Sequence, residues 1–145
     1  MEGTLKTRQA SSMMAWRDEY RVGIASIDAE HKELIALIND LQSAMLDGRG
    51  KQVMKQVLDA LAAYTVRHFS HEEQLMQMHR FPGFEQHKLE HDKLIAKVKA
   101  LQESFRTGRS SISVEVFAFL QNWLSGHIIG VDKKYSAHLK AAGVE

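Results

Sequence analysis

Apolar residues recur every three or four positions along four segments of the chain, and a few polar side chains occupy the same positions. This spacing lines one face of an α-helix, whereas a strand would alternate apolar and polar residues every two positions. The four stripes are Ile27, His31, Leu34, Ile38, Leu41 and Met45; Val57, Leu61, Tyr64, His68, Glu72, Leu75 and His79; Phe84, His87, His91, Leu94, Val98, Leu101 and Phe105; and Val116, Leu120, Trp123, His127 and Val131. Each stripe predicts one amphipathic helix with its apolar face buried.

Three turn-like breaks separate these segments, at residues 47–50, 81–83 and 107–111. Each break contains glycine, which can end a helix in the left-handed conformation, and serine or aspartate can cap the next helix. The segments between the breaks are too long for strands. The sequence therefore predicts an all-α protein, an up-down-up-down antiparallel four-helix bundle with short loops.

The two ends of the chain are expected to lie outside the bundle. Residues 1–15 are polar and predict an N-terminal tail or arm, residues 16–140 form the bundle, and residues 141–145 form a C-terminal tail. Residues 1–15 lack the apolar stretch of a signal peptide, which favours a cytoplasmic location. The longest apolar runs are a few residues, against about 20 needed to span a bilayer, so no membrane insertion is expected.

Composition narrows the chemistry. The 19 Lys and Arg residues nearly balance the 18 Asp and Glu residues, and a net charge of +1 gives no basic footprint for nucleic acid. This balance, with no obvious exposed apolar stripe, favours a monomer. Cysteine is absent, which excludes disulfides, iron–sulfur clusters and a cysteine nucleophile. Because the chain has 8 histidines, metal or redox chemistry would rely on imidazole and carboxylate groups.

Six ionisable side chains occupy stripe positions that should face the bundle axis: His31, His68, Glu72, His87, His91 and His127. A buried ionisable group without a partner is costly, and any one of these alone would be a hydrogen-bonded core residue. Together they favour a shared metal centre, because two pairs are spaced four residues apart on one helix face. Antiparallel helices would gather the five histidines toward one end of the bundle.

The same residues belong to a longer pattern. Its parts are Trp16; Val22-Gly23-Ile24; Ile27-Asp28-x-x-His31-Lys32-x-Leu34; His68-Phe69-x-x-Glu72-Glu73-x-x-Met76; His87-x-x-x-His91; and Trp123-Leu124-x-x-His127-Ile128-x-x-x-Asp132-x-x-Tyr135. Over residues 16–135 the chain resembles the hemerythrin family in its single-domain bacterial form. The pattern has many parts, and no ligand position is substituted.

This resemblance implies two iron ions per chain in a non-haem di-iron centre with an oxo or hydroxo bridge. The implied ligands are His87, His91 and His127 for one iron, His31 and His68 for the other, and Glu72 and Asp132 as bridges. The iron with two histidines would keep an open coordination position. The implied function is reversible dioxygen binding for storage, transport or delivery, without enzymatic turnover, and any oxygen-consuming enzyme partner is unidentified.

Asp132 is unusual because it follows His127 by five residues, which is about 140° of rotation on an ideal α-helix. We therefore expect a local irregularity at residues 128–132, where Gly130 would make it easiest. Reversible oxygen binding also needs a small, dry pocket. The resemblance assigns this pocket to Leu34, Phe69, Trp123, Leu124, Ile128 and Tyr135. Leucine and aromatic residues at helical spacing are equally typical of an ordinary core.

Several polar residues fall outside this ligand set. We expect His71, His79 and His138 to be surface or rim residues, with His79 also a candidate for an entry tunnel. Glu73 should be solvated or paired with a neighbour. Asp28 should cap its helix or orient a ligand histidine.

Three other functions remain open from the sequence. A di-iron enzyme acting on nitric oxide or peroxide is disfavoured because such carboxylate-rich sites use Glu-x-x-His motifs, whereas this chain has pairs spaced by four. An oxygen or redox sensor would be expected to carry an output domain, which 145 residues do not accommodate. A structural zinc site would not need seven ligands.

Overall fold

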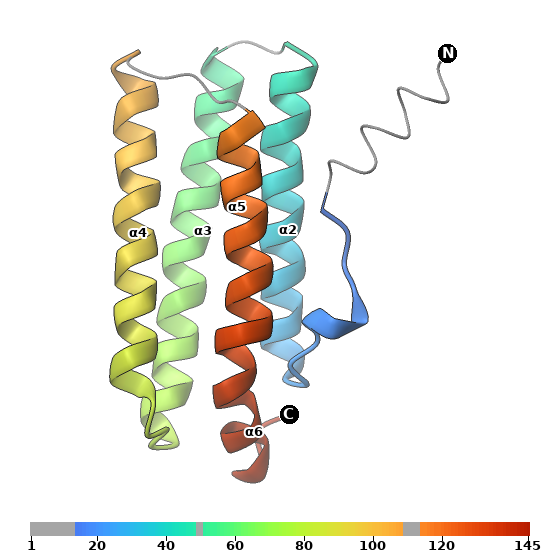
Figure 1. Cartoon of the computed structure of the whole chain (residues 1–145), viewed down its shortest axis with the longest axis vertical. Helices are drawn as coiled ribbons and strands as arrows, with labels where there is room; N and C mark the ends of the chain where they lie inside the picture. Colours follow the sequence, from blue (N-terminus) through green and yellow to red (C-terminus); the bar gives the residue numbers. More distant parts are fainter. Residues whose placement is uncertain (1–13, 49–50, 109–113) are drawn as a thin grey trace.

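The computed structural model describes residues 14–48, 51–108 and 114–145, without the side chains of residues 114–117. Its elements are the 3₁₀ turn η1 (Asp18–Tyr20), α2 (Ala25–Leu46), α3 (Lys51–Met78), α4 (Phe84–Arg106), α5 (Val114–His127), the π-helical turn η2 (Ile128–Asp132) and α6 (Lys133–Ala141). Four long helical rods run side by side, and α5, η2 and α6 form the fourth rod (Figure 1). The prediction of an all-α four-helix bundle is confirmed.

The helix ends lie at the three predicted breaks. α2 and α4 end just before Gly48 and Gly108, whose φ angles of 62° and 76° are in the left-handed region that glycine adopts without strain. α3 ends differently, because Arg80 takes the left-handed conformation with a φ of 56°. The N–H of Phe81 then donates to the carbonyl of Met76 at 2.9 Å, which closes the helix end.

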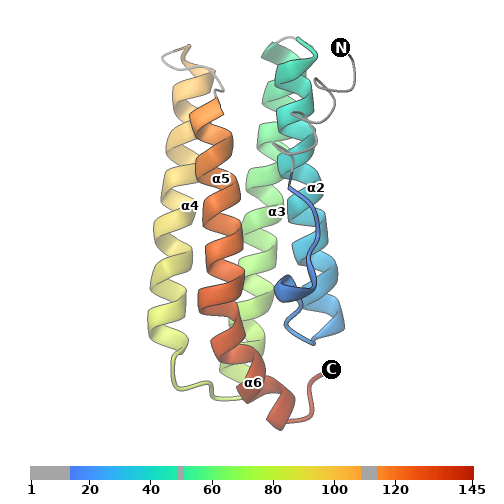
Figure 2. The ribbon, with the colours of Figure 1, turned by 45° about the vertical axis from the view of Figure 1, so that its right-hand side comes forward.

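Successive helices are neighbours in the bundle. α2 packs against α3, α3 against α4, and α5 closes the bundle against α2 (Figure 2). The buried residues of α2 and α4 follow the predicted stripes. Among the described residues, no helix is long and apolar enough to cross a membrane.

The buried face of α3 differs from the predicted stripe. Its buried residues are Leu58, Leu61, Ala62, Thr65, His68, Phe69, Glu72 and Met76. Val57, Tyr64, Leu75 and His79 are only partly buried. The predicted stripe and the observed buried residues both have helical spacing, and both include Leu61. Spacing alone therefore does not decide which of the two faces is buried. The neighbouring helices select the face that carries Thr65 and Met76.

Part of the predicted N-terminal arm lies within the described residues. The Met14 N–H donates to Asn39 Oδ1 at 2.9 Å, and Asn39 Nδ2 donates to the Met14 carbonyl at 2.7 Å. The Lys32 ammonium lies 4.9 Å from the centroid of the Trp16 ring. These contacts fasten the segment before η1 along α2 (Figure 2). Residues 1–13 lie outside the described residues, so the domain limits stay a prediction.

Candidate metal centre

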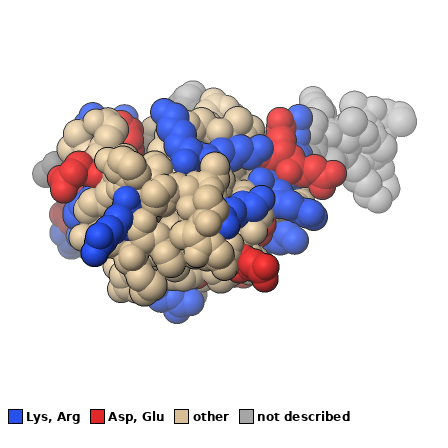
Figure 3. Space-filling view, turned by 90° about the horizontal axis from the view of Figure 1, so that it is seen from below, with Lys and Arg blue, Asp and Glu red and all other residues tan. Residues whose placement is uncertain are grey.

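All seven predicted metal ligands meet in the interior at one end of the bundle. α2 supplies one of them, α3 and α4 supply two each, α5 supplies one, and η2 supplies the last: His31, His68, Glu72, His87, His91, His127 and Asp132. None of these residues is more than 7% exposed. Seen from this end, the molecular surface is mostly uncharged, with Lys and Arg side chains spread around it (Figure 3).

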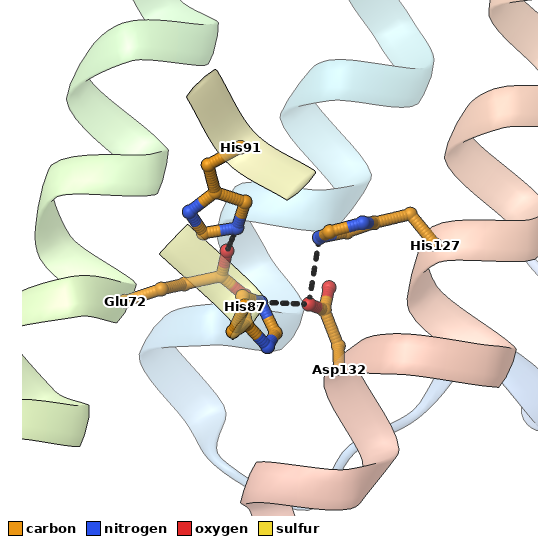
Figure 4. Close-up of side chains that lie close together, drawn as sticks. All are labelled: Glu72, His87, His91, His127 and Asp132. Atoms are coloured by element: carbon orange, nitrogen blue, oxygen red, sulfur yellow. Dashed lines mark ion pairs between the residues drawn. The ribbon is translucent and has the colours of Figure 1, made fainter. Parts of the chain in front are cut away.

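The seven side chains form two groups that share both carboxylates. We define the three-histidine group as His87, His91 and His127 with Glu72 and Asp132, and the two-histidine group as His31 and His68 with the same two carboxylates. Within each group, the potential ligand atoms lie within 4.8 Å of one another. Figure 4 shows the three-histidine group, in which all five side chains point toward a common centre.

Each carboxylate touches histidines of both groups. The Nε2 atoms of His87 and His127 lie 3.1 and 3.0 Å from Asp132 Oδ1, and His31 Nε2 lies 3.0 Å from Asp132 Oδ2. Glu72 Oε1 lies 3.2 Å from the Nε2 atoms of both His68 and His91. The two carboxylates are therefore placed to bridge two cations.

The inward-facing polar atoms have no hydrogen-bond partner among the described residues. They are the five histidine Nε2 atoms, Glu72 Oε1 and both oxygens of Asp132. Unpaired buried polar groups are costly and rare. Imidazole nitrogens and carboxylate oxygens together are suitable ligands for iron. The cluster is therefore a buried His/Glu/Asp site able to bind metal, and these residues fit the iron that the resemblance implies.

Two further carboxylates set the tautomer of two candidate ligand histidines. His68 Nδ1 donates to Glu30 Oε1 at 2.6 Å, and His91 Nδ1 donates to Glu73 Oε2 at 2.8 Å. A histidine that carries its proton on Nδ1 presents a free lone pair on Nε2. These two hydrogen bonds therefore aim the Nε2 lone pairs of both rings at the centre.

The charge balance of the cluster favours a cation at its centre. Burial alone would lower the pKa of His31, but Asp132 and Glu72 outweigh it and raise the pKa to about 8. Burial would also lower the pKa of His68, but Glu72 and Glu30 raise it to about 10. Burial raises the pKa of Glu72, yet the neighbouring histidines hold it well below its usual value. The field that retains protons here would equally attract a metal ion.

Asp132 reaches the centre because the helix widens before it. Residues 128–132 form a π-helical turn, so the irregularity predicted there is confirmed. A π-helix bonds residue i to i+5, which returns the fifth residue to the same face. The Asp132 carboxylate consequently points at His127 (Figure 4). Gly130 lies in this turn, but a Cβ there would meet no atom within 4 Å, so crowding does not require glycine.

Apolar and aromatic residues surround the candidate ligands. The Phe69 ring stacks on the His91 ring, with ring centroids 3.7 Å apart and an angle of 1° between the planes. The ring centroids of Trp123 and His127 lie 5.7 Å apart. Leu34, Leu124 and Ile128 are buried in the main core. The Tyr135 hydroxyl donates a hydrogen bond to Glu72 Oε2. Burial and Glu72 raise the Tyr135 pKa well above its usual value, so this hydroxyl keeps its proton. The assignment of these six residues to an oxygen pocket stays a prediction.

Other sequence expectations are corrected or refined by the structure. Asp28 neither caps α2, whose N-cap is Ile24, nor orients a ligand histidine. Its carboxylate instead accepts the N–H groups of Val22 and Gly23 at 2.8 and 3.2 Å, which fastens the preceding loop to the helix. Of the two expectations for Glu73, pairing is the one observed.

The three remaining histidines lie away from the two groups. His71 is partly exposed, as expected of a rim residue, but its Nδ1 also donates to Glu30. His138 Nε2 donates to the carbonyl of His79 at 2.7 Å, which links α6 to the α3–α4 loop. Glu30 is a residue of this network that the sequence pattern does not single out. Its position directly before His31 was the only signal, and the partner of Glu30 is on another helix.

Comparison with known proteins agrees with this geometry. The family model described as the hemerythrin HHE cation binding domain matches residues 22–139. A bacteriohemerythrin of Methylococcus capsulatus is 35% identical over 131 residues, which cover 90% of this chain and 99% of that protein. A myohemerythrin of Riftia pachyptila is 30% identical over 90% of this chain and 98% of its own length.

Solved structures also place this chain with the hemerythrins. The crystal structure of a wild-type hemerythrin superposes with a TM-score of 0.84 and 34% sequence identity. The match covers 88% of this chain and 98% of the hemerythrin chain. With the family model matching most of the bundle, this chain belongs to the hemerythrin family.

Proposed function

We propose that this protein binds dioxygen reversibly at a non-haem di-iron centre. The observation that carries the proposal is the set of five buried Nε2 atoms and two shared carboxylates, all turned inward without hydrogen-bond partners among the described residues. The three-histidine group would hold one iron and the two-histidine group the other, with Glu72 and Asp132 held in common. Bound there, the irons would supply a redox-active pair with a coordination position free for a small ligand.

The free coordination position is inferred from the number of side chains in each group. The three-histidine group offers five side chains and the two-histidine group offers four. A cation in the smaller group therefore has one protein ligand fewer. An open position of this kind is what separates a metal that takes up a ligand from a purely structural one.

The residues around the centre support binding without turnover. Phe69, Leu34, Leu124 and Ile128 are at most 1% exposed, so they keep the site dry. A dry site limits the supply of water and protons that would convert a bound oxygen molecule into products. The Tyr135 hydroxyl holds the Glu72 carboxylate in place. A histidine-rich donor set also differs from the Glu-x-x-His sites of carboxylate-rich di-iron proteins.

The physiological setting is part of the proposal. Oxygen storage, transport or delivery is the proposed role, in a cytoplasmic monomer, because the sequence favours both properties. The relatives named bacteriohemerythrin and myohemerythrin support oxygen binding as the common function.

Reversibility under a controlled atmosphere tests this function. The reduced, iron-loaded protein should be colourless, gain charge-transfer absorption in air, and lose it again when oxygen is removed. Iron analysis should give two ions per chain. A Gln74→Ala variant serves as the control, because it changes an exposed side chain of α3 outside both groups and should behave like the wild type. Continuous oxygen consumption would indicate an enzyme instead, and fewer than two irons per chain would contradict the centre.

A further inference from the structure

Glu30 joins two histidines, of which only one belongs to the metal centre. Its Oε1 accepts a hydrogen bond from His68 Nδ1 at 2.6 Å and another from His71 Nδ1 at 3.0 Å. His71 Nδ1 also lies 2.9 Å from Oε2. Glu30 is on α2 and both rings are on α3, so this carboxylate connects the two helices that supply the two-histidine group.

The two-histidine group depends heavily on this connection. His31 Nδ1 has no hydrogen-bond partner among the described residues, so no hydrogen bond from behind fixes its ring. Within this group, the ring of His68 is the one held by a hydrogen bond from its Nδ1 atom, and Glu30 accepts that bond. In the three-histidine group, Glu73 has a comparable place behind His91, but among the described residues no second histidine is recorded on Glu73.

Glu30 needs a second contact to stay in this position. The side chain of Glu30 is 23% exposed, whereas that of His68 is 1% exposed. A glutamate at the edge of the solvent can rotate toward water, and fixing such a side chain costs conformational entropy. The N–H of His71 is directed at the carboxylate from the outer side, so it holds both oxygens where His68 needs them.

We propose that His71 is a positioning residue for the two-histidine group, acting through Glu30 on His68. This inference rests on the metal centre proposed above. Removing a residue behind a ligand typically costs about 10- to 100-fold in metal affinity. The effect of losing His71 should be confined to the metal held by His31 and His68, because no recorded contact joins His71 to the three-histidine group.

Metal release from the full chain tests the proposal without any measurement of oxygen. The protein is loaded with Co²⁺, and an excess of chelator is added while the two release phases are followed by absorbance. Glu73→Gln identifies the phase of the three-histidine group, because Glu73 supports His91 alone. His71→Ala should accelerate the other phase by up to about tenfold, the lower end of the cost of losing a direct partner, because Glu30 itself remains.

Two further variants separate positioning from general damage to the fold. Asn at position 71 places an amide N–H close to where Nδ1 lies, so His71→Asn should restore slow release. Gln74→Ala changes an exposed side chain of α3 outside the network and should release both metals at the wild-type rate. Thermal unfolding of each metal-free variant, followed by circular dichroism, should match the wild type.

The possible failures are distinguishable. A wild-type chain that binds fewer than two metals contradicts both the centre and this inference. A wild type that binds two, with His71→Ala releasing both at wild-type rates or accelerating both equally, overturns the role of His71 alone. Failure of His71→Asn to restore slow release also overturns it, because the N–H donor would not be what matters.

Discussion

The two histidine groups share two carboxylates but differ in how much aromatic packing supports their histidines. Aromatic packing supports the three-histidine group, since Phe69 stacks on His91 and Trp123 lies beside His127. A hydrogen bond to a partly exposed carboxylate supports the two-histidine group, because His68 donates to Glu30 behind it. The three-histidine side is thus fixed by aromatic contacts in addition to the hydrogen bond from His91 to Glu73, and the two-histidine side by the hydrogen bond from His68 to Glu30. This difference matches a saturated site beside one that takes up a ligand.

The comparison extends to charge. Glu72 and Asp132 are equally available to both groups, yet the pKa values of His31 and His68 rise to about 8 and about 10. Glu30 adds to this effect at His68. Burial lowers the pKa of His127 in the three-histidine group, but Asp132 and Glu72 outweigh it and raise this pKa as well, so both sides of the centre favour positive charge.

The largest effect is expected from replacing Asp132, one of the two carboxylates that the groups share. Asp132→Asn keeps the size of the side chain but replaces the carboxylate that touches His31, His87 and His127. Affinity for both metals should fall by more than the roughly 100-fold upper cost of losing a residue behind a ligand. Metal titration followed by calorimetry measures this loss. The exposed Asp40→Asn is the control, and normal affinity for either metal in Asp132→Asn would show that the groups are independent.

A smaller effect is expected from removing the aromatic ring that packs on the three-histidine group. Phe69→Ala removes the ring stacked on His91 and leaves a cavity, which should lower the free energy of unfolding by about 3–5 kcal/mol. Denaturant unfolding of the metal-free chain measures this change. In the loaded protein, the metal of the three-histidine group should be released faster. Faster release from the two-histidine group alone would contradict the assignment of aromatic support to His91.

The raised pKa values of His31 and His68 predict how stability depends on pH in the metal-free protein. The pKa values of His31 and His68 in the folded chain lie above the ordinary histidine pKa of about 6.5. Their contribution to stability is therefore complete below that value and is lost as pH rises through about 8 and then about 10. The free energy of unfolding should fall over this range, and His68→Gln should flatten the upper part of the curve. A wild-type curve that rises between these pH values would refute the raised pKa values.

The smallest effect is expected at a residue of the predicted oxygen pocket rather than at a candidate ligand. Leu124→Asn places a polar amide at a position that is 1% exposed, where it would favour the entry of water and protons. Loss of the oxygenated form should become severalfold faster, measured as the decay of its charge-transfer absorption. Leu46→Asn, at an exposed leucine, should leave the decay unchanged. An unchanged rate in Leu124→Asn would remove this residue from the predicted pocket.

The sequence predicted those features that one helix determines by itself. Spacing along each segment gave four helices, the breaks between them and the ionisable residues on their inner faces. The five-residue interval between His127 and Asp132 also predicted the irregular turn, because an ordinary α-helix would have placed the carboxylate on another face.

Features that depend on a partner from another element were not predictable in this way. Glu30 gains its role from two histidines on α3, and Asp28 binds the backbone of a loop. The buried face of α3 was also shifted, because neighbouring helices chose between two sets of equal spacing. Local pattern thus located the candidate ligands, whereas the groups that orient them are defined by contacts between distant segments.

The π-helical turn η2 has a consequence beyond Asp132, because it acts as one extra residue inserted into a continuous helix. One residue corresponds to about 100° of rotation, so everything after the turn is rephased relative to α5. Tyr135, Ser136 and Leu139 of α6 are buried in this rephased register. If residues 128–132 formed an ordinary α-helix without losing a residue, these side chains would turn by about 100° away from the core. The same local widening thus sets both a metal-facing carboxylate and the docking of the last helix.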